Sequence, residues 1–404
     1  MKLGRIALGV VAFLSFILLA AYQGYVYTTP GSEHAAEVAR NLTRARRRTY
    51  LHDHRRPEQL DGPLFDMMTV MRTPTCVNYQ TIMGALKHLK PQGLRRIYVS
   101  VPGAWVESMS SLHEDVIGVD DSKAVPGVSY DIIGKELNKQ GYNGQKMLAG
   151  RRSTGWYLMQ FLNLGFGMRD DVLDFVLLHD ADQMILSNFQ VFGLGTFTGP
   201  DGIRPTINLR PGGSDAHQYE KAHRCLLNGE NIEDPPDYSS YTSHSWMSYR
   251  PYITELLTRF GGHLRDVAEG QPQPWLKRIV ECIDQANPHL GFGEITTYLS
   301  YNVRHHPSQY TFVPLVTWTR VPISLGDLGV KGENGFCCPT EKMLQLHEHE
   351  GYEYVGMELG HPWPFETQLR CGYTTNASYL SEAYPPPDHS FWQSRNVRLQ
   401  RHVR

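Results

Sequence analysis

Two aspartates separated by one small residue, Asp180 and Asp182, have the types and the spacing to do chemistry in this sequence. They follow a short apolar run, residues 175–178, whose length and composition predict a buried strand of an α/β sheet. Ligands of open α/β sheets gather outside the carboxyl ends of the strands, so the pair would lie where a metal ion or a phosphorylated ligand binds. Carboxylate oxygens suit Mg²⁺ or Mn²⁺, and such an ion could in turn hold a diphosphate.

The same tripeptide also has a structural interpretation. Asp-x-Asp arises by chance in solvated loops and at helix N-caps, and Ser187 and Asn188 mark another turn a few residues later. The apolar strand before the pair, together with Met184 and Ile185 after it, favours the functional interpretation.

Cationic residues precede the run that leads into this strand. Residues 153–166 have apolar side chains at helical spacing, and Lys146, Arg151 and Arg152 stand just before them. Cations at a helix N-terminus, where backbone N–H groups are unpaired, create a natural site for an anion.

Within that helix, Ser153 or Thr154 can cap the first turn, and Gln160 is a polar exception on a stripe that we interpret as core packing. Asp120 and Asp121 close another predicted strand, residues 116–119. Acidic residues at strand ends bind a ribose or a base in nucleotide folds, although they more often open a turn.

Two candidates lie later in the chain. Glu294 follows a glycine near the start of a predicted helix, where the backbone could approach a ligand, but a lone acid there is also a good cap. His361 stands between Gly and Pro, and this tight backbone context makes it a better metal ligand than His347 or His349.

The elements that must position these residues alternate between strands and helices. We expect strands at 67–71, 96–101, 116–119, 175–178 and 241–249, and helices at 79–89, 153–166, 219–227, 250–260, 275–285 and 292–302. This alternation predicts an α/β fold with a mainly parallel sheet and right-handed crossovers. Residues 200–215 and 230–241, rich in Gly, Pro or polar residues, are expected to be loops over the site.

Length and charge limit the classes of function. A chain of 404 residues can form one large catalytic domain or two ordinary ones, and we expect one domain at 63–384 followed by a tail at 385–404. Because 39 basic residues nearly balance 41 acidic ones, no global field favours nucleic acid as a partner.

The first residues predict a membrane anchor. Residues 6–27 are apolar and end in tyrosines, which is long enough to cross a bilayer with an interfacial aromatic belt. Lys2 and Arg5 place residues 1–5 in the cytosol, so the remainder would be lumenal in a single-pass type II protein. A cleaved signal peptide is the alternative. The polar residues 28–62 are typical of a stem.

Two further features fit the secretory pathway. Asn41 and Asn376 lie in N-glycosylation sequences. The even number of cysteines permits disulfides in an oxidising lumen, but six cysteines allow fifteen connectivities, and the spacing does not choose among them.

Taken together, these segments resemble glycosyltransferases of the type A fold, which use nucleotide-sugar donors and carry a DxD motif. The resemblance is carried by residues 155–162, 175–182 and 243–247, and by Gly293, Glu294, Tyr298 and Asn302. The span 65–301 also resembles an uncharacterised family of DxD-bearing proteins related to them. A single Rossmann-like domain of type A is the fold that this resemblance implies.

The resemblance also implies roles for residues. Asp180 and Asp182 would hold Mn²⁺ or Mg²⁺, with His361 as a third ligand, and Glu294 would be a general base or an acceptor binder. The donor, a UDP- or GDP-sugar, and the acceptor, a glycan or glycoprotein, would be contacted by two further sets of residues. These are Lys146, Arg151, Arg152, Gln160 and Asp120 for the donor, and His244 and Trp246 for the acceptor.

We therefore expect a metal-dependent, type II membrane glycosyltransferase of the Golgi with a lumenal catalytic domain. A phosphohydrolase of the haloacid dehalogenase type also ends a strand in Asp-x-Asp, but there the motif usually opens the domain and is followed by Gly or Thr. Here Gln183 and Met184 follow it. A membrane-anchored glycan-binding protein that has lost catalysis is a third interpretation.

Overall fold

The computed structural model of the chain describes residues between 63 and 356. The described ranges are 63–72, 74, 76–144, 147–148, 151–188, 190–194, 203–211, 218–235, 239–262, 267–284, 286, 291–314, 318–319, 344–345, 348–349 and 351–356. The chain divides into two units, Met1–Leu60 and Asp61–Arg404, and every described residue belongs to the second.

The expected cytosolic tail (1–5), membrane anchor (6–27), stem (28–62) and C-terminal tail (385–404) all lie outside these ranges. Within the described residues, no helix combines the length and the apolar character that crossing a bilayer requires.

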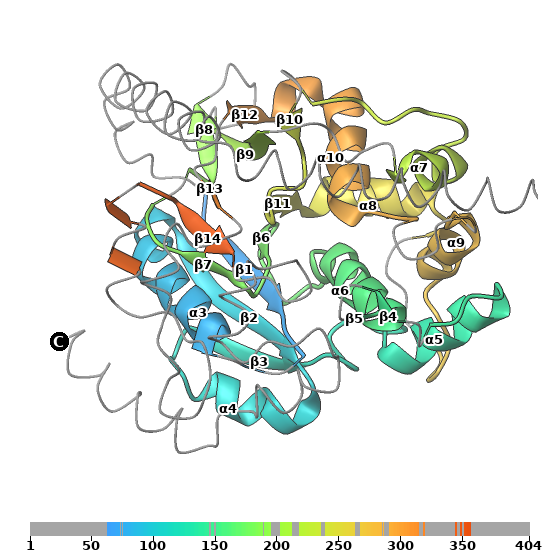
Figure 1. Ribbon diagram of the computed structural model, residues 1–404, viewed down its shortest axis with the longest axis horizontal. Helices are drawn as coiled ribbons and strands as arrows, with labels where there is room; N and C mark the ends of the chain where they lie inside the picture. Colours follow the sequence, from blue (N-terminus) through green and yellow to red (C-terminus); the bar gives the residue numbers. More distant parts are fainter. Residues whose placement is uncertain are drawn as a thin grey trace, which may run out of the picture. The chain divides into compact units, whose positions relative to one another are not determined.

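A five-stranded sheet, in the order β11-β6-β1-β2-β3, forms the centre of the second unit (Figure 1). Its strands are β1 (Phe65–Val70), β2 (Leu94–Val101), β3 (Val116–Asp120), β6 (Phe175–His179) and β11 (Ser245–Tyr249). β6, β1, β2 and β3 pair in parallel, and the edge strand β11 pairs antiparallel with β6. The prediction of an α/β fold with a mainly parallel sheet is therefore confirmed.

Helices cover both faces of this sheet. The α-helices of the second unit include α3 (Cys76–His88), α4 (Val106–Ser110), α5 (Tyr130–Lys139), α6 (Ser153–Phe166), α7 (Glu220–Leu226), α8 (Arg250–Arg259), α9 (Pro274–Cys282) and α10 (Glu294–His305), and α3 and α6 pack on opposite faces of the sheet. Successive side chains of a strand point to opposite faces. On β1, Met68 belongs to one core cluster with Phe161 of α6, whereas Met67 belongs to another with Ile82 of α3. Because both faces are covered, β6 is apolar over residues 175–178, whereas β1 and β11 also bury the polar residues Asp66, Thr69, Ser245 and Ser248.

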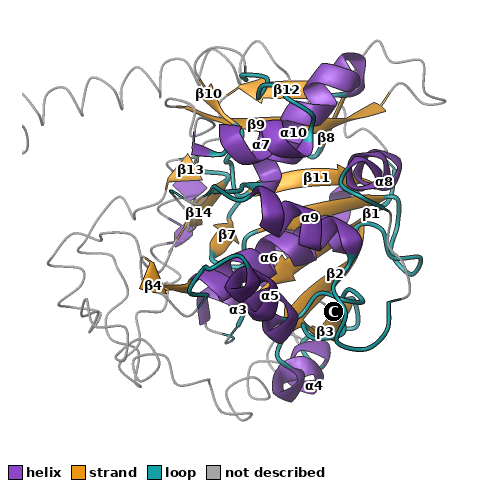
Figure 2. Ribbon diagram, turned by 90° about the vertical axis from the view of Figure 1, so that its right-hand side faces the viewer, coloured by secondary structure: helices purple, strands orange, loops and turns teal. Residues whose placement is uncertain are grey.

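A second sheet lies above the central one in both ribbon views (Figures 1 and 2). β9 (Ile203–Pro211) pairs with β8 (Phe192–Leu194), β10 (Ser239–Ser240) and β12 (Thr311–Pro314). The prediction that residues 200–215 form a loop is therefore wrong for β9. Ile207 and Leu209 are buried and alternate with polar residues, but the Gly and Pro residues at both ends hid this period.

Two smaller groups of strands complete the described fold. β7 (Gln183–Ile185) pairs with β14 (Tyr354–Gly356), which pairs with β13 (Trp318–Thr319). β4 (Met147–Leu148) and β5 (Arg151–Arg152) form a short hairpin directly before α6.

A disulfide joins Cys225 of α7 to Cys282 of α9, with 5.6 Å between the Cα atoms. This pairing resolves one bond of the connectivity that the cysteine spacing left open.

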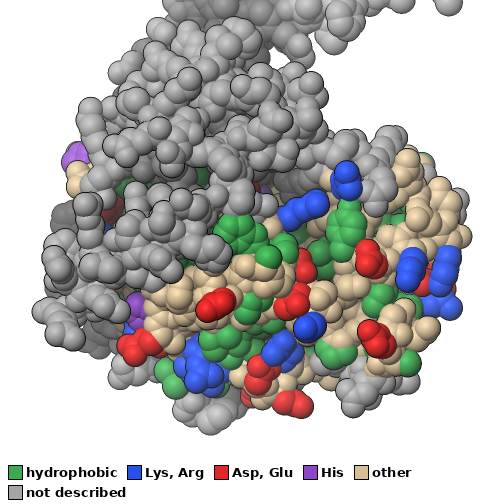
Figure 3. Space-filling model, turned by 90° about the horizontal axis from the view of Figure 1, so that it is seen from below, with side chains coloured by type: hydrophobic (Ala, Val, Ile, Leu, Met, Phe, Trp, Pro, Cys, Tyr) green, Lys and Arg blue, Asp and Glu red, His purple; other side chains and the backbone are tan. Residues whose placement is uncertain are grey.

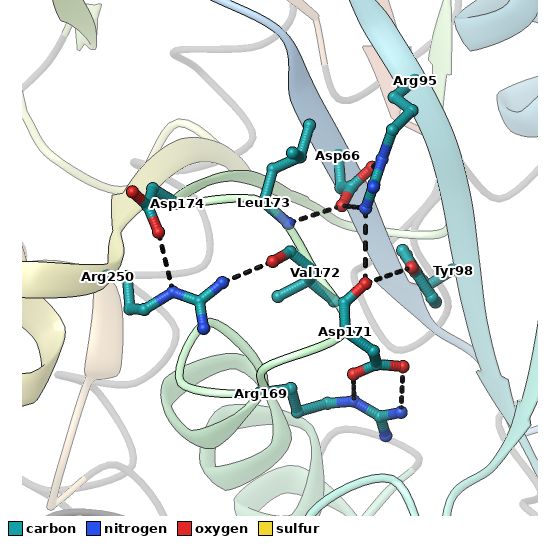
Figure 4. A network of polar contacts seen from close by, with 9 residues as sticks. All are labelled: Asp66, Arg95, Tyr98, Arg169, Asp171, Val172, Leu173, Asp174 and Arg250. Atoms are coloured by element: carbon teal, nitrogen blue, oxygen red, sulfur yellow. Dashed lines mark hydrogen bonds and ion pairs between the residues drawn. The ribbon is translucent and has the colours of Figure 1, made fainter.

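A polar network ties the loop before β6 to the amino ends of the central strands (Figure 4). The buried Asp66 on β1 accepts hydrogen bonds from Arg95 of β2, from Nε at 2.9 Å and from Nη2 at 2.5 Å, and a third from the Leu173 N–H at 2.8 Å. Tyr98 donates to the Asp171 carbonyl at 3.1 Å. On the other side of the loop, Arg250 pairs through Nε with Asp174 at 2.9 Å and donates to the carbonyl of Val172. The network thus fixes the start of the strand whose opposite end carries Asp180.

On the face of the molecule in Figure 3, acidic and basic side chains of the described residues are interspersed. This distribution agrees with the near-zero net charge of the sequence and offers no single-sign surface to a polyanion.

Candidate functional site

Asp180 directly follows the last residue of β6 and is held by His244 at two points. The Asp180 N–H donates to the His244 carbonyl at 2.9 Å, and His244 Nδ1 lies 2.8 Å from Asp180 Oδ2. Because an ionised carboxylate only accepts hydrogen bonds, Nδ1 carries the proton in this contact.

The register of the sheet explains why Asp180 and His244 lie side by side. β11 runs antiparallel to β6 and places Ser245 opposite His179, so the residue before Ser245 comes to lie beside the residue after His179. A pair separated by 64 positions in sequence is thus brought together by the edge strand.

The next residues of the motif are anchored by α3. The Ala181 carbonyl accepts hydrogen bonds from Asn78 Nδ2 at 2.8 Å and from Thr81 Oγ1 at 2.9 Å. The Gln183 N–H donates to the Asp180 carbonyl at 3.1 Å, which closes a turn around Asp182, a partly exposed residue. The backbone of the motif is therefore fixed.

Beneath the motif, His179 is buried and its Nε2 lies 2.7 Å from the Gln183 carbonyl. Burial lowers the pKa of His179 to about 4, so its ring is neutral at physiological pH. Gln183 is also buried, and a Cβ on Gly356 would come within 2.6 Å of its side chain. The polar residue after the motif is therefore part of the packing between β7 and β14.

Glu294 begins α10, as expected, and is only 4 % exposed. Asn163 Nδ2 donates to its Oε1 at 3.1 Å, and the Glu294 N–H donates to Gln160 Oε1 at 3.2 Å. Gln160 and Asn163 are three residues apart on α6 and share one face of that helix. Two amides on α6 thus fix the first residue of α10.

Burial, the largest effect, and the charge of Asp180 raise the pKa of Glu294, whereas the hydrogen bond from Asn163 and bonds from backbone N–H groups lower it, and the net pKa is about 7. The charge of Asp180, at the end of β6, thus acts on the Glu294 carboxyl at the start of α10. Near neutral pH the Glu294 carboxyl can both accept and release a proton, which is the property of a general acid or base.

Gln160 contacts the backbone of Glu294, and within the described residues its buried Nε2 has no hydrogen-bond partner. The amide oxygen of Gln160 therefore positions the backbone of Glu294.

At the end of β3, Asp120 accepts hydrogen bonds from the Ser122 N–H at 3.0 Å and from Ser122 Oγ at 2.7 Å. These contacts open a turn, which is the structural interpretation of this residue. Its neighbour Asp121 has a raised pKa because of burial and the charge of Asp120, and Arg72 counteracts that shift. Arg72 also lies over the ring of Tyr130, 5.8 Å from its centroid.

The start of α6 matches the expected position of cations but not the expected caps. Arg152 is the N-cap residue of α6 and is exposed, and Arg151 precedes it on β5. Ser153 and Thr154 lie inside the helix and do not cap it. Instead, Thr154 Oγ1 donates to the Gly144 carbonyl at 2.8 Å.

The two residues expected at the acceptor have other surroundings. Trp246 is 3 % exposed, and its ring lies 4.7 Å from that of Tyr298 in the core between β11 and α10. This position does not support contact with an acceptor, because the inward face of β11 is closed by α10. His244 contacts Asp180, so its side chain is directed to the DxD motif.

Lys146, His361, Asn41 and Asn376 lie outside the described residues. Among those described, His113, Glu114 and Asp115 form a group whose ligand atoms lie within 4.8 Å of one another. That group precedes β3, at the amino end of the sheet, and Asp115 is already paired with Lys90. The group of His113, Glu114 and Asp115 therefore lies at one edge of the sheet, and Asp180 lies at the other edge.

Sequence reasoning missed Asn163, Asn78 and Thr81. The sequence does indicate Asn163, because Gln160 and Asn163 are polar residues at positions i and i+3 of an otherwise apolar helix. No pattern in the sequence indicates Asn78 or Thr81, because their role depends on how α3 packs against the DxD motif.

No protein-family model matches this sequence, and no curated protein is significantly similar to it. Among solved structures, the chain is similar to mouse xyloside xylosyltransferase 1 in its apo form, with 13 % identity, a TM-score of 0.37, and coverage of 75 % of this chain and 100 % of that chain. It is also similar to the galactosyltransferase LgtC bound to donor and acceptor sugar analogues, with 9 % identity, a TM-score of 0.34, and coverage of 79 % and 94 %. An active-site mutant of LgtC gives the same values.

Proposed function

We propose that this protein is a metal-dependent glycosyltransferase that moves a sugar from a nucleotide-sugar donor to an acceptor hydroxyl. The observation that carries the proposal is the arrangement of Asp180, His244 and Glu294. His244 orients the Asp180 carboxylate at the carboxyl end of a parallel strand, and the charge of Asp180 acts on Glu294, a buried acid whose pKa is about 7.

The chemistry of the two aspartates supports binding of a divalent cation. Asp180 and Asp182 supply hard oxygen donors, and the hydrogen bond from His244 uses only one of the two Asp180 carboxylate oxygens. Mn²⁺ or Mg²⁺ bound there would neutralise charge that develops on a nucleoside diphosphate leaving group. The third ligand expected from sequence, His361, stays part of this proposal.

The donor would extend from this pair across the carboxyl ends of the neighbouring strands. Asp120 and Asp121 at the end of β3, with Arg72 and Tyr130, offer carboxylates, a cation and an aromatic ring of the kind that a nucleoside requires. Arg152 at the N-terminus of α6 would add a cation near the phosphates.

Glu294 would move the proton. In its ionised form it can accept the proton of the acceptor hydroxyl as that oxygen attacks the sugar, and Asn163 holds its Oε1 during the transfer. Gln160 Nε2 would donate a hydrogen bond to a sugar hydroxyl at this site.

The lumen of the Golgi is the location that we propose, with residues 6–27 as the anchor of a type II protein and a glycan or glycoprotein as the acceptor. The Cys225–Cys282 disulfide supports a compartment of the secretory pathway, because such bonds persist where the environment is oxidising.

A donor-binding assay on the detergent-solubilised full chain tests the proposal. Thermal unfolding and donor hydrolysis would be measured with a panel of UDP- and GDP-sugars, in Mn²⁺ and in EDTA. We expect one nucleotide class to stabilise the protein only with Mn²⁺, and Asp180→Asn or Asp182→Asn to abolish this effect. Asp131→Asn, on the exposed start of α5, is the matched control.

Hydrolysis of a generic phosphate ester, with no stabilisation by any nucleotide sugar, would overturn the proposal in favour of a phosphohydrolase.

A further inference from the structure

We propose that His244 is a positioning residue that sets the orientation of the Asp180 carboxylate, and thereby the affinity of the DxD motif for a divalent cation. This inference rests on the proposed function, because it assigns a role toward the cation that Asp180 would hold. It replaces the expectation that His244 contacts the acceptor.

The two contacts between His244 and Asp180 constrain different features. The bond from the Asp180 N–H to the His244 carbonyl, at 2.9 Å, fixes the backbone of Asp180. The bond from His244 Nδ1 to Oδ2, at 2.8 Å, fixes the rotation of the carboxylate group. With both in place, the direction of the remaining oxygen Oδ1 is determined before any ligand arrives. Hydrogen bonds of this kind to metal-binding carboxylates strengthen the binding of the metal.

The backbone of His244 adopts a conformation that costs energy and that serves this contact. Its φ is +61°, and within the described residues the other non-glycine residue with a positive φ is Asn228, at +53°. Asn228 follows the end of α7, where an asparagine in this conformation is ordinary. A histidine in it, at the entrance to a strand, persists only when its surroundings determine it.

The surroundings of His244 do determine it. Ser243 donates from its N–H to the Tyr241 carbonyl and from Oγ to the Ser245 carbonyl, both at 2.8 Å. Tyr354 of β14 donates from its hydroxyl to the Ser243 carbonyl. The His244 side chain is 8 % exposed. The residues on both sides of His244 are therefore fixed, and the positive φ directs its ring to Asp180.

Three substitutions separate the side chain from the backbone. His244→Gly keeps the positive φ without strain and removes the donor to Asp180. His244→Asn also tolerates a positive φ, and its side-chain N–H₂ can take the place of Nδ1, but it has no counterpart of Nε2. Asn228→Gly is the matched control, because it makes the same kind of change at the other non-glycine position with positive φ.

The measurement is the affinity of the full chain for Mn²⁺ alone, followed by the loss of the free-ion signal in electron paramagnetic resonance. We expect His244→Gly to weaken binding by about 10- to 100-fold, as mutations of such outer partners typically do. His244→Asn should restore affinity to within about threefold of wild type, and Asn228→Gly should equal wild type. Thermal unfolding in EDTA shows whether each variant is folded, and if His244→Gly does not fold, loss of Mn²⁺ binding in a folded His244→Asn variant still overturns the inference.

Equal Mn²⁺ affinity of His244→Gly and wild type would overturn the inference. Loss of binding in His244→Asn would overturn it too, since it would indicate that Nε2 is a direct ligand. Asp180→Asn separates this failure from failure of the proposed function. If Asp180→Asn binds Mn²⁺ as wild type does, the proposed metal site itself is wrong, and the inference falls with it.

Discussion

Asn163 on α6 donates a hydrogen bond to Glu294 on α10, with 3.1 Å between Nδ2 and Oε1, and so connects two residues that are 131 positions apart in sequence. Both residues are buried, at 6 % and 4 % exposure, so the bond forms where an unpaired carboxylate would be costly. Burial and the charge of Asp180 favour the neutral form of Glu294, whereas this side-chain hydrogen bond favours the ionised form.

Replacing Asn163 by Leu should therefore raise the pKa of Glu294 above its value of about 7, because the donor to the ionised form is lost. If Glu294 is the general base, the acidic limb of the kcat/KM profile should move to higher pH by about one unit, with a loss of roughly 1–3 kcal/mol of stability for the broken bond. Asn138→Leu, on the exposed face of α5, is the control. A profile that keeps its midpoint would contradict the role of Glu294.

Glu294 also makes stability depend on pH. Its pKa is about 7 in the folded protein and about 4.5 in the unfolded chain. Between these values the unfolded chain loses a proton that the folded protein keeps, so stability falls as the pH rises and levels off above 7. Glu294→Gln should therefore increase the free energy of unfolding at pH 8 by roughly 3 kcal/mol, and hardly change it at pH 4.

Urea denaturation in EDTA at pH 4, 6 and 8 measures this difference between Glu294→Gln and wild type. The difference should grow with pH. A constant difference at all three values would mean that Glu294 does not titrate in this range.

The Cys225–Cys282 disulfide should support the start of α10 as well as the overall fold. The two cysteines are 57 positions apart, and closing a loop of this length stabilises a protein by about 4 kcal/mol in the chain-entropy model. Tyr219, just before α7, packs so closely on Gly293 that a Cβ there would meet its ring at 2.8 Å. Loosening α7 would therefore loosen the residue that precedes Glu294.

We expect Cys225→Ala with Cys282→Ala to lower the free energy of unfolding by about 3–4 kcal/mol, and to increase hydrogen exchange at the first turn of α10. Dithiothreitol should reproduce the loss in wild type, and the double variant shows how much of that effect comes from this bond. Unchanged exchange at α10 would separate the disulfide from the site.

Most of the fold could be predicted from local patterns in the sequence. The helix expected at 153–166 coincides with α6, and the strand at 175–178 is one residue shorter than β6, because apolar period and strand length are local properties. α5 was not predicted, although Ser129 caps it by accepting a hydrogen bond from the Ile132 N–H at 3.3 Å. Its apolar stripe is short, and the buried Glu136 interrupts it.

The site was predictable only in part, for a different reason. The position of Asp180 follows from a strand that ends in a carboxylate, which is a local signal. The contact with His244 depends on the register of an edge strand that joins the sheet late in the chain, and the contact of Glu294 with Asn163 depends on how α10 packs on α6. For Trp246 the sequence suggested contact with an acceptor, but strand alternation directs it to α10.

The buried pair of Asp66 and Arg95 gives a test that separates stability from metal binding. Asp66 is fully buried, whereas the Arg95 side chain is 33 % exposed and can be rehydrated when its partner is lost. Asp66→Asn should therefore cost about 2–3 kcal/mol, somewhat less than breaking a pair with both members buried.

The pair lies at the amino ends of β1 and β2, whereas Asp180 lies at the carboxyl end of β6, so Mn²⁺ affinity should not change in the folded Asp66→Asn variant. Urea denaturation gives the stability, and a Mn²⁺ titration under native conditions gives the affinity. Asp170→Asn, whose side chain is fully exposed in the same loop, should alter neither. A weaker Mn²⁺ affinity in Asp66→Asn would show that the loop before β6 transmits its position along the strand to the DxD motif, and that the two edges of the sheet are not independent.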